Sequence, residues 1–595
     1  MFDFKETWKM RIAAALNKTL PESCAVTVEQ VIAEIPPDPQ MGDLGFPMFG
    51  FAKIAKKAPP LIAQELAAIL TAENYADEIM VKGPYINIRF NRGNFAKELL
   101  ERIFDSKKTF GRPESLAGTR IMVEFSSPNT NKPLHLGHLR NNVLGESISR
   151  ILKACGAEVR KVSIINDRGL HICKSMLVYQ KYGEGKTPET EGVKSDHFVG
   201  DWYVRFSKEL HKQVEELMKN GDLKKEEAEE KAPFLSEARE MLLKWEEGDT
   251  ETVKLWSLMN KWAIEGMNET YKRTGISFDQ YYFESETYLT GKDEILKGLE
   301  QGLFYKAEDG AVWVDLSAEK LDKKVLLRKD GTSLYITQDI GTAILRHKDW
   351  SFNRLVYVVG SEQEYHFKVL FSILKKLGFT WAEKLYHLSY GMVNLPEGKM
   401  KTREGTVVDA DDLLDNLTEL ALKEIQDKER EEAVGDPNTT AEKIALGALH
   451  YYLLQVSPSR DMLFNPQESL SFKGNTGPYL QYMGARISSI LRKTSVQAEN
   501  IKAELLTSDQ EWELLKAIAA YPEAVALSAE KLEPSILSNY LYELSKVFSR
   551  FYHECPVLNA ESAELMSARI QLASGAIYVL KDALELLCIP FLETM

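Results

Sequence analysis

The chain has 595 residues and a mass of 67.5 kDa, which at roughly 150 residues per domain predicts about four domains. It carries 74 Lys and Arg against 88 Asp and Glu, and in an evenly charged protein this net charge of −14 disfavours a nucleic-acid partner. The segments 180–256 and 409–436 carry net charges of −6 and −8 and contain the whole acidic excess. Because the rest of the chain is balanced, the acidic total does not exclude a nucleic-acid partner.

Membrane proteins and disulfide-linked secreted proteins are excluded next. The longest segment without a charged side chain, 444–459, has 16 residues, fewer than the ~20 apolar residues of a membrane span. The N-terminus has acids and no uninterrupted apolar core, so we expect no targeting peptide. Five scattered cysteines without a Cys-x-x-Cys pair indicate a cytoplasmic protein. His171 and Cys173 have no second ligand pair nearby, so no metal site is predicted.

The first 115 residues are predicted to form a small α+β domain. Apolar side chains recur every fourth residue from Phe4 to Leu20, which indicates an amphipathic helix. A Pro-rich link at 35–39 precedes further helix, and 85–90 alternates as a strand does. Glycines and a proline near 111–118 mark the end of the domain.

Residues 116–435 are predicted to form an α/β domain of the Rossmann type. Buried strands at 121–125 and 159–166 flank a helix at 137–154, the repeating unit of a parallel sheet. The segment 180–256 has the pattern of a helical insertion, and the sheet resumes at 354–359 before a helix that ends near 377. From 440 to 595 long amphipathic helices predict an all-α domain.

The sharpest chemical motif, residues 132–138, follows the first buried strand and opens a helix. His135 and His138 lie one turn apart, and Gly137 between them leaves room for a ring or a phosphate. A helix N-terminus offers backbone N–H groups to phosphate, and two imidazoles can donate to charge that develops on its oxygens. Half of a zinc site or two surface histidines also fit the motif.

A second motif is the basic, glycine-flanked loop at 398–405. Its cations Lys399, Lys401 and Arg403 suit a clamp on a triphosphate. An ordinary solvated basic turn is the alternative for this loop taken alone.

The two motifs together resemble those of class I aminoacyl-tRNA synthetases, and further blocks resemble the arginine-specific branch. Six ordered blocks carry this likeness over essentially the whole chain, at 42–43 with 83–87, 124–140, 335–339, 360–363, 477–482, and 551–553 with Met595. The chain is identified as a member of that branch. The resemblance implies that ATP activates L-arginine to arginyl-adenylate, which is then transferred to the 3′ end of tRNA arginine isoacceptors. We expect ATP with Mg²⁺ as co-substrate, no tightly bound cofactor, and a monomer.

Residue chemistry agrees with arginine as the substrate. Arginine is a cation with a planar fork of five donors, so its pocket should offer carboxylates and no competing cation. Glu124 at the end of the first strand and Asp339, one helical turn after Tyr335, are the candidates. A helix cap or a salt bridge is the alternative role for Asp339. The resemblance implies that Asn129 and Gln363 hold the α-amino and carbonyl groups, and Ser127 is a further candidate in the same block as Asn129.

The phosphate loop departs from the family pattern in one place. Thr402 stands where the family has a second lysine, and Lys401 takes the serine position. Arginine-specific members are thought to compensate with a lysine before the histidine motif, and Lys132 occupies that place here. The catalytic candidates are therefore Lys132, His135, His138, Lys401 and Arg403. The segment Gly391, Met392 and Val393, after a strand, is expected to line the adenine pocket.

The helical C-terminal domain resembles an anticodon-binding module. Flipped bases stack on aromatic rings and on arginine, and the candidates are Tyr479, Gln481, Tyr482 and Arg486, with Met595 at the chain end. The core stripe of an ordinary helix is the alternative for each of them. Tyr85 and Asn87 are candidates for contact of the N-terminal domain with the outer corner of tRNA.

Three other functions compete with an arginine ligase. A related adenylyltransferase also uses the histidine motif but is typically short and lacks a helical RNA-reading domain. A non-enzymatic RNA-binding protein is disfavoured by the intact motifs. Specificity for another amino acid is disfavoured by Glu124, Tyr335 and Asp339.

Overall fold

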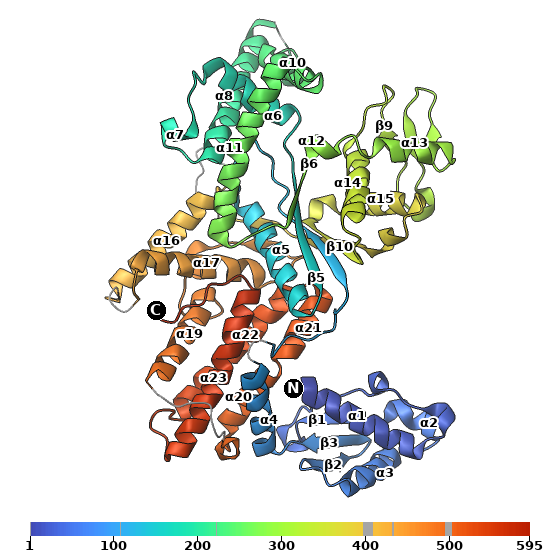
Figure 1. Ribbon diagram of the computed structural model, residues 1–595, viewed down its shortest axis with the longest axis vertical. Helices are drawn as coiled ribbons and strands as arrows, with labels where there is room; N and C mark the ends of the chain where they lie inside the picture. Colours follow the sequence, from blue (N-terminus) through green and yellow to red (C-terminus); the bar gives the residue numbers. More distant parts are fainter. Residues whose placement is uncertain (1, 107–108, 222, 397–407, 431–433, 494–501) are drawn as a thin grey trace.

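The computed structural model describes residues 2–106, 109–221, 223–396, 408–430, 434–493 and 502–595 (Figure 1). The N-terminal domain contains an antiparallel sheet of order β1-β3-β2, built from β1 (Leu44–Pro47), β2 (Glu78–Lys82) and β3 (Tyr85–Arg89). Helices α1 (Phe2–Thr19), α2 (Ala52–Ala55) and α3 (Pro59–Ala72) accompany it. Trp8, Ile12 and Leu16 are buried, which confirms the amphipathic first helix.

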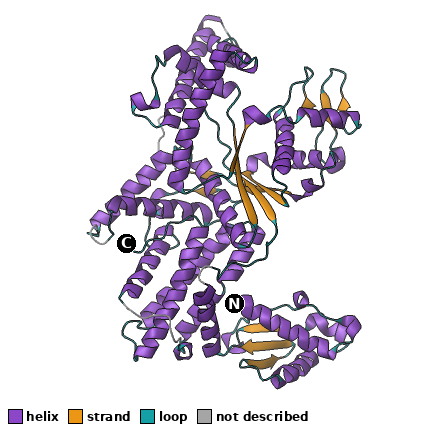
Figure 2. Cartoon of the chain, viewed as in Figure 1, coloured by secondary structure: helices purple, strands orange, loops and turns teal. Residues whose placement is uncertain are grey.

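The catalytic half is built on a parallel sheet of order β11-β10-β4-β5-β6 (Figure 2). Its strands are β4 (Arg120–Glu124), β5 (Glu158–Ile165), β6 (Gln280–Phe283), β10 (Arg354–Gly360) and β11 (Leu385–Tyr390). The chain winds from β4 outward to β6 and then returns on the other side through β10. Ligands bind at such a reversal, outside the carboxyl ends of the strands, and the predicted Rossmann-type fold is confirmed.

Helices cover both faces of this sheet because its strands are apolar on both sides. On one face Val123 and Val356 join the core that includes α5 (Leu136–Ala154). On the other face Met122 and Leu355 join the core that includes α14 (Tyr335–Asp349) and α15 (Glu364–Lys376).

A helical excursion fills the chain between β5 and β6 and forms the teal and green upper part of Figure 1. It consists of α6 (Leu170–Tyr182), α7 (Pro188–Glu191), α8 (Ser195–Gly221), α9 (Lys225–Glu230), α10 (Pro233–Glu246) and α11 (Thr250–Thr274). These helices extend beyond the insertion predicted at 180–256 on both sides.

A small antiparallel sheet after β6 was not predicted. It contains β7 (Tyr305–Lys306), β8 (Val312–Val314) and β9 (Lys324–Leu327), and it follows α12 (Glu284–Thr287) and α13 (Lys292–Glu300). Its strands have at most four residues each, too few for a clear alternating pattern.

In the remaining described residues the regular structure is helical apart from a two-residue parallel pair, β12 (Val393–Asn394) with β13 (Met462–Leu463). The helices are α16 (Ala410–Asp427), α17 (Pro437–Leu454), α18 (Pro466–Ser469), α19 (Gly477–Arg492), α20 (Asp509–Ala519), α21 (Tyr521–Lys531), α22 (Pro534–Glu554) and α23 (Ala563–Leu586). The N-terminal domain rests on this bundle through α4 (Arg92–Ser106) (Figure 1). No helix in the described ranges is long and apolar enough to cross a membrane.

Candidate active site

The histidine motif forms the N-terminal cap of α5. The Nδ1 atom of His135 accepts from the N–H of Gly137 at 3.1 Å, and Nδ1 of His138 accepts from the N–H of His135 at 3.2 Å. The two rings lie 3.8 Å apart between centroids, as the spacing predicted. Because each Nδ1 accepts a hydrogen bond, a neutral ring carries its proton on Nε2, and both rings can donate outward.

Electrostatics keeps both imidazoles neutral. Desolvation, with the nearby Lys132 charge, lowers the pKa of His135 to about 4. Desolvation, together with His135 and Lys132, lowers the pKa of His138 well below its ordinary value. The motif therefore offers two neutral Nε2–H donors beside an ammonium and a helix N-terminus, an arrangement that suits an anionic ligand.

The segment 408–410 lies antiparallel to the histidine motif. Leu136 N–H donates to the carbonyl of Val408, and Ala410 N–H donates to the carbonyl of Leu134, both at 3.0 Å. The predicted loop cations Lys399, Lys401 and Arg403 lie outside the described residues, as does the whole loop at 398–405. The chain that follows the loop nevertheless begins beside His135.

A cavity of about 1270 Å³ opens at the carboxyl ends of β4 and β5. All six residues predicted to bind arginine line it, namely Glu124, Ser127, Asn129, Tyr335, Asp339 and Gln363. The buried end of the cavity contains Glu124, whereas Asn129 and Gln363 are exposed. Tyr335 is 77% exposed, so its ring is accessible to a ligand.

Glu124 does not offer the free carboxylate that we predicted. Its Oε2 accepts from Nη1 of Arg346, which lies 2% exposed on α14 and also lines the cavity. Its Oε1 accepts from Ser127 Oγ at 3.4 Å. Burial raises the pKa of Glu124, and the Arg346 guanidinium opposes that effect. The expectation of a pocket without a competing cation is therefore wrong at its buried end, because Arg346 already pairs with Glu124.

Asp339 is more accessible than Glu124. His366 on α15 lies with Nε2 2.6 Å from Oδ2 of Asp339, and both side chains line the cavity. No hydrogen bond to the other carboxylate oxygen, Oδ1, is found among the described residues. One oxygen of Asp339 is thus engaged by a neighbouring side chain, through a hydrogen bond with His366.

Glu284, the first residue of α12 after β6, also lines this cavity and was missed. Desolvation and the charges of Asp167 and Asp339 raise its pKa to about 7, although Arg168 opposes them. The position of Glu284 directly after a strand could have identified it from the sequence. Strand β6 has only four residues, however, and was not recognised from the sequence.

The segment 391–393 is fixed to the helical domain through the buried Arg140. One guanidinium nitrogen of Arg140 donates to the carbonyls of Gly391 and Met392 at 2.6 and 3.1 Å. The other donates to Pro458 and Arg460 at 3.0 and 2.7 Å. A Cβ on Gly391 would lie 2.5 to 2.6 Å from atoms of residues 460 and 461. The close approach of these two segments therefore requires glycine at position 391.

The same architecture is found in known proteins. A family model for the class I (R) tRNA synthetase catalytic domain matches residues 100–465, and models for the arginyl tRNA synthetase N-terminal domain and the DALR anticodon binding domain match 6–90 and 480–595. The arginine–tRNA ligases of Treponema denticola and Treponema pallidum are 61% and 51% identical over 607 aligned residues, which cover all of each chain. The chain belongs to the arginyl-tRNA synthetase family.

A solved structure agrees with this assignment. Arginyl-tRNA synthetase of Thermus thermophilus superposes with a TM-score of 0.80 at 27% identity, over 99% of this chain and 100% of that chain. The predicted family, the fold class and the enzymatic activity, ligation of arginine to tRNA, are confirmed.

Two of the tRNA-contact candidates are buried in this member of the arginyl-tRNA synthetase family. Gln481 is fully buried, and its Nε2 donates to the carbonyls of Lys443 and Pro590 at 2.8 Å each. Asn87 lies buried within β3. The Gln481 side chain thus links parts of the helical bundle, and neither buried side chain presents a surface to RNA as we expected.

The other candidates remain partly accessible. Tyr479, Tyr482 and Arg486 are half-buried on α19, and the Arg486 guanidinium lies 4.1 Å from the centroid of the Tyr552 ring. Tyr85 packs edge-on against the exposed Phe49. Met595 is partly buried, and its carbonyl accepts from Arg430 at 3.0 Å. These partly accessible groups lie on α19, in the N-terminal domain and at Met595.

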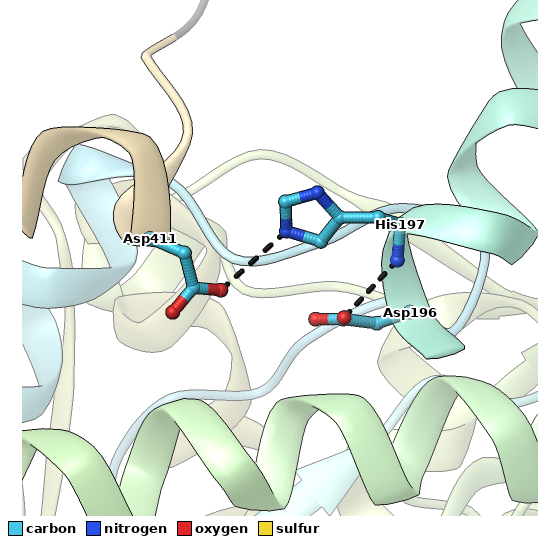
Figure 3. Close-up of side chains that lie close together, drawn as sticks. All are labelled: Asp196, His197 and Asp411. Carbon is cyan, nitrogen blue, oxygen red and sulfur yellow. Dashed lines mark hydrogen bonds and ion pairs between the residues drawn. The ribbon is translucent and has the colours of Figure 1, made fainter. Parts of the chain in front are cut away.

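A group of potential metal ligands lies near the histidine motif, at Asp196, His197 and Asp411 (Figure 3). Their ligand atoms lie within 4.8 Å of one another. The ammonium of Lys194 donates to Asp196 at 3.0 Å and to Asp411 at 2.8 Å. Because this cation already occupies the space between the carboxylates, we assign no metal here.

Proposed function

We propose that the cavity holds L-arginine and that the histidine motif holds the phosphates of ATP during the two steps of the ligation. The observation that carries this proposal is that six residues, predicted from three separate sequence blocks, line one cavity at the carboxyl ends of β4 and β5. An amino acid bound there has its carboxylate at the sheet edge from which α5 starts.

Arginine recognition rests on Asp339 and Glu284. His366 occupies Oδ2 of Asp339, so Oδ1 is the oxygen left for the substrate guanidinium. The charge of Asp339 contributes to the raised pKa of Glu284, and a guanidinium placed between the two carboxyl groups relieves this repulsion. The Glu124–Arg346 pair closes the buried end, and Tyr335 covers the mouth. Lysine is disfavoured because one ammonium cannot reproduce the planar fork.

The remaining polar groups suit the other end of the substrate. Asn129 and Gln363 are exposed on the cavity wall and hold the α-amino and carbonyl groups, with Ser127 beside them. ATP lies on the N-terminus of α5 over Gly137, and 391–393 lines its adenine pocket. Lys132, His135 and His138 donate to the phosphates, and Lys399, Lys401 and Arg403 remain assigned from the sequence alone.

The chemistry proceeds by in-line substitution. A carboxylate oxygen of arginine attacks the α-phosphorus, the bond to the β-phosphate oxygen breaks, and pyrophosphate leaves. A ribose hydroxyl at the 3′ end of tRNA then attacks the carbonyl carbon and releases AMP. Placement and charge stabilisation carry such reactions, without a covalent enzyme nucleophile. Mg²⁺ accompanies ATP as co-substrate, and no tightly bound cofactor is required.

The outer parts of the chain serve tRNA. The units are 1–115 for the outer corner of tRNA, 116–435 for catalysis and 440–595 for the anticodon, whose bases stack on Tyr479, Tyr482 and Arg486. The substrates are arginine isoacceptors. We expect a monomer from the sequence, and the five free cysteines support the cytoplasm.

The test is arginine-dependent exchange of labelled pyrophosphate into ATP, with and without tRNA. We expect exchange with wild-type protein when tRNA is present and its loss in Asp339→Ala, with nearly unchanged tRNA affinity. Absence of exchange in wild type, or equal loss of exchange and tRNA affinity in the variant, contradicts the proposal.

A further inference from the structure

The start of α16 lies beside the histidine motif and also contacts the helical insertion. Residues 408–410 pair with 134–136 through two backbone hydrogen bonds of 3.0 Å. The extended backbone of His135 (φ −136°, ψ 173°), which places both rings, therefore lies against this segment. Asp409 caps α16 by accepting from the N–H of Asp411 and of Asp412. The cap joins residues 408–410 rigidly to the first turn of α16.

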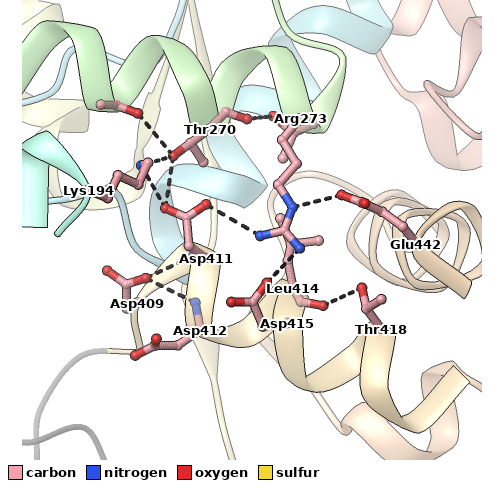
Figure 4. Close-up of polar contacts among 12 residues, drawn as sticks. Lys194, Thr270, Arg273, Asp409, Asp411, Asp412, Leu414, Asp415, Thr418 and Glu442 are labelled. Carbon is pink, nitrogen blue, oxygen red and sulfur yellow. Dashed lines mark hydrogen bonds and ion pairs between the residues drawn. The ribbon is translucent and has the colours of Figure 1, made fainter. Parts of the chain in front are cut away.

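Asp411 fastens this piece to the base of the helical insertion (Figure 4). Its Oδ2 accepts from Lys194 Nζ at 2.8 Å and from Thr270 Oγ1 at 3.0 Å. Lys194 also donates to Thr270 at 2.7 Å, and Nε2 of His197 lies 3.4 Å from Asp411. Lys194 and His197 stand at the start of α8 and Thr270 near the end of α11, so two helices of the insertion converge on one carboxylate.

The position of Asp411 makes these contacts strong. Its side chain is 14% exposed. Although desolvation acts the other way, the close contacts of His197 and Lys194 hold its pKa well below the usual range. Charged hydrogen bonds shielded from water are among the stronger ones in proteins. Asp411 is therefore held as an anion at the contact between α16 and the helical insertion.

A second cation, Arg273, links the same place to α17. Arg273 lies 3.7 Å from Asp411 Oδ1, 2.7 Å from Asp415 and 2.8 Å from Glu442 on α17. The pairs with Asp415 and Glu442 reach α16 and α17 but do not touch the histidine segment. They provide a comparison for the Asp411 contacts within the same network.

We propose that Asp411 is a positioning residue for the histidine motif, and that the base of the helical insertion holds it there. By fastening 408–410 to Lys194 and Thr270, Asp411 fixes the backbone from which His135 and His138 direct their Nε2–H groups. The insertion thus acts on adenylate formation without touching arginine or ATP. This inference rests on the phosphate role proposed above for the two histidines.

The test is Asp411→Asn in the full-length protein, assayed by arginine-dependent pyrophosphate exchange with tRNA present. Misplaced catalytic groups lower rates by about 10- to 100-fold, so we expect a kcat loss of that size. The KM for arginine should stay within about twofold, because Asp411 is not among the residues that line the cavity. The imidazole ¹⁵N signals of His135 and His138 should shift.

Asp415→Asn is the matched control, since it removes a carboxylate from the same helix and the same arginine. Its kcat should stay within about twofold of wild type. An Asp411→Asn variant that behaves like this control, or whose arginine KM rises in step with the loss of kcat, overturns the proposal. If Asp411→Asn does not fold, Thr270→Val, which removes one hydrogen bond from the same oxygen, must lower kcat without changing arginine KM.

A parallel His138→Gln variant separates this inference from the proposed function. If His138→Gln keeps full exchange activity, the phosphate role itself fails. If His138→Gln loses activity and Asp411→Asn keeps it, the phosphate role stands and only the positioning role is wrong.

Discussion

At the scale of single residues, sequence chemistry selected residues that line one cavity but did not reveal how they pair within it. Glu124 and Asp339 are both cavity carboxylates, yet Glu124 pairs with Arg346, 222 positions away, and Asp339 with His366. No local pattern reveals such pairs, because only the fold brings β4, α14 and α15 together. The same holds for Glu284, whose pKa near 7 arises from burial and the neighbouring Asp167 and Asp339 charges.

The Glu284 carboxyl predicts a pH-dependent arginine affinity. With its pKa about 7 in the free enzyme, Glu284 is largely protonated at pH 6, and binding of a guanidinium favours the carboxylate and releases the proton. Arginine affinity should therefore rise by up to about tenfold per pH unit below 7 and level off above pH 8. Calorimetry in two buffers of different ionisation enthalpy should show proton release at pH 6.

Glu284→Gln provides the control for this prediction, because it keeps the size of the side chain and cannot ionise. Its arginine affinity should be weaker and flat between pH 6 and 8. A wild-type affinity that falls as pH rises, or a slope that persists in Glu284→Gln, contradicts the role of this carboxyl.

At the scale of elements, the strand–turn–helix unit from β4 to α5 was predictable because a buried strand followed by a polar turn and a helix has a clear pattern. Its strain was not. Ser126 and Ser127 have φ of 80° and 48°, each at a cost of about 1–3 kcal/mol. Asn141 accepts from Ser126 N–H at 2.6 Å, and Tyr271 lies 2.6 Å from the Ser126 hydroxyl. Helix α5 and the insertion thus hold the turn that lines the cavity.

The Arg140 contact predicts how α5 supports the adenine side. Arg140→Met leaves four carbonyls without their buried donor, so we expect a loss of about 3 kcal/mol in the free energy of unfolding. The KM for ATP should rise more than that for arginine, because 391–393 lies at the proposed adenine pocket. Denaturant unfolding and pyrophosphate-exchange kinetics measure both. Equal changes in the two KM values would show that Arg140 acts only on overall stability.

At the scale of the whole molecule, the acidic segments of the sequence meet in space. Lys194, in the first segment, contacts Asp411 in the second. Arg273 on α11, beyond the first segment, pairs with Asp411 and Asp415, and both cations offset part of the negative charge where the segments touch. Composition showed that the charge is localised, and only the fold shows that the two segments are neighbours. Changes in the sequence pattern along the chain likewise predicted the order of the domains. They did not predict that the N-terminal domain docks on the C-terminal helices.

The docking of the N-terminal domain predicts an effect on tRNA alone. Phe95 on α4 packs edge-on against Trp512 of the bundle at 4.9 Å, and truncation of a buried Phe costs about 3–5 kcal/mol. Phe95→Ala should loosen this docking and raise the tRNA KM in aminoacylation, with the KM for arginine and ATP unchanged. Leu66→Ala, buried on α3 within the same domain, is the control and should raise the tRNA KM less. An equal rise in both variants would refute a role for the docking.

The most direct test of the account is a crystal structure of the protein with L-arginine bound. We predict the guanidinium between Asp339 Oδ1 and Glu284, with His366 still on Oδ2 and the Glu124–Arg346 pair intact. A guanidinium that displaces Arg346 from Glu124, or arginine bound outside this cavity, would contradict the account.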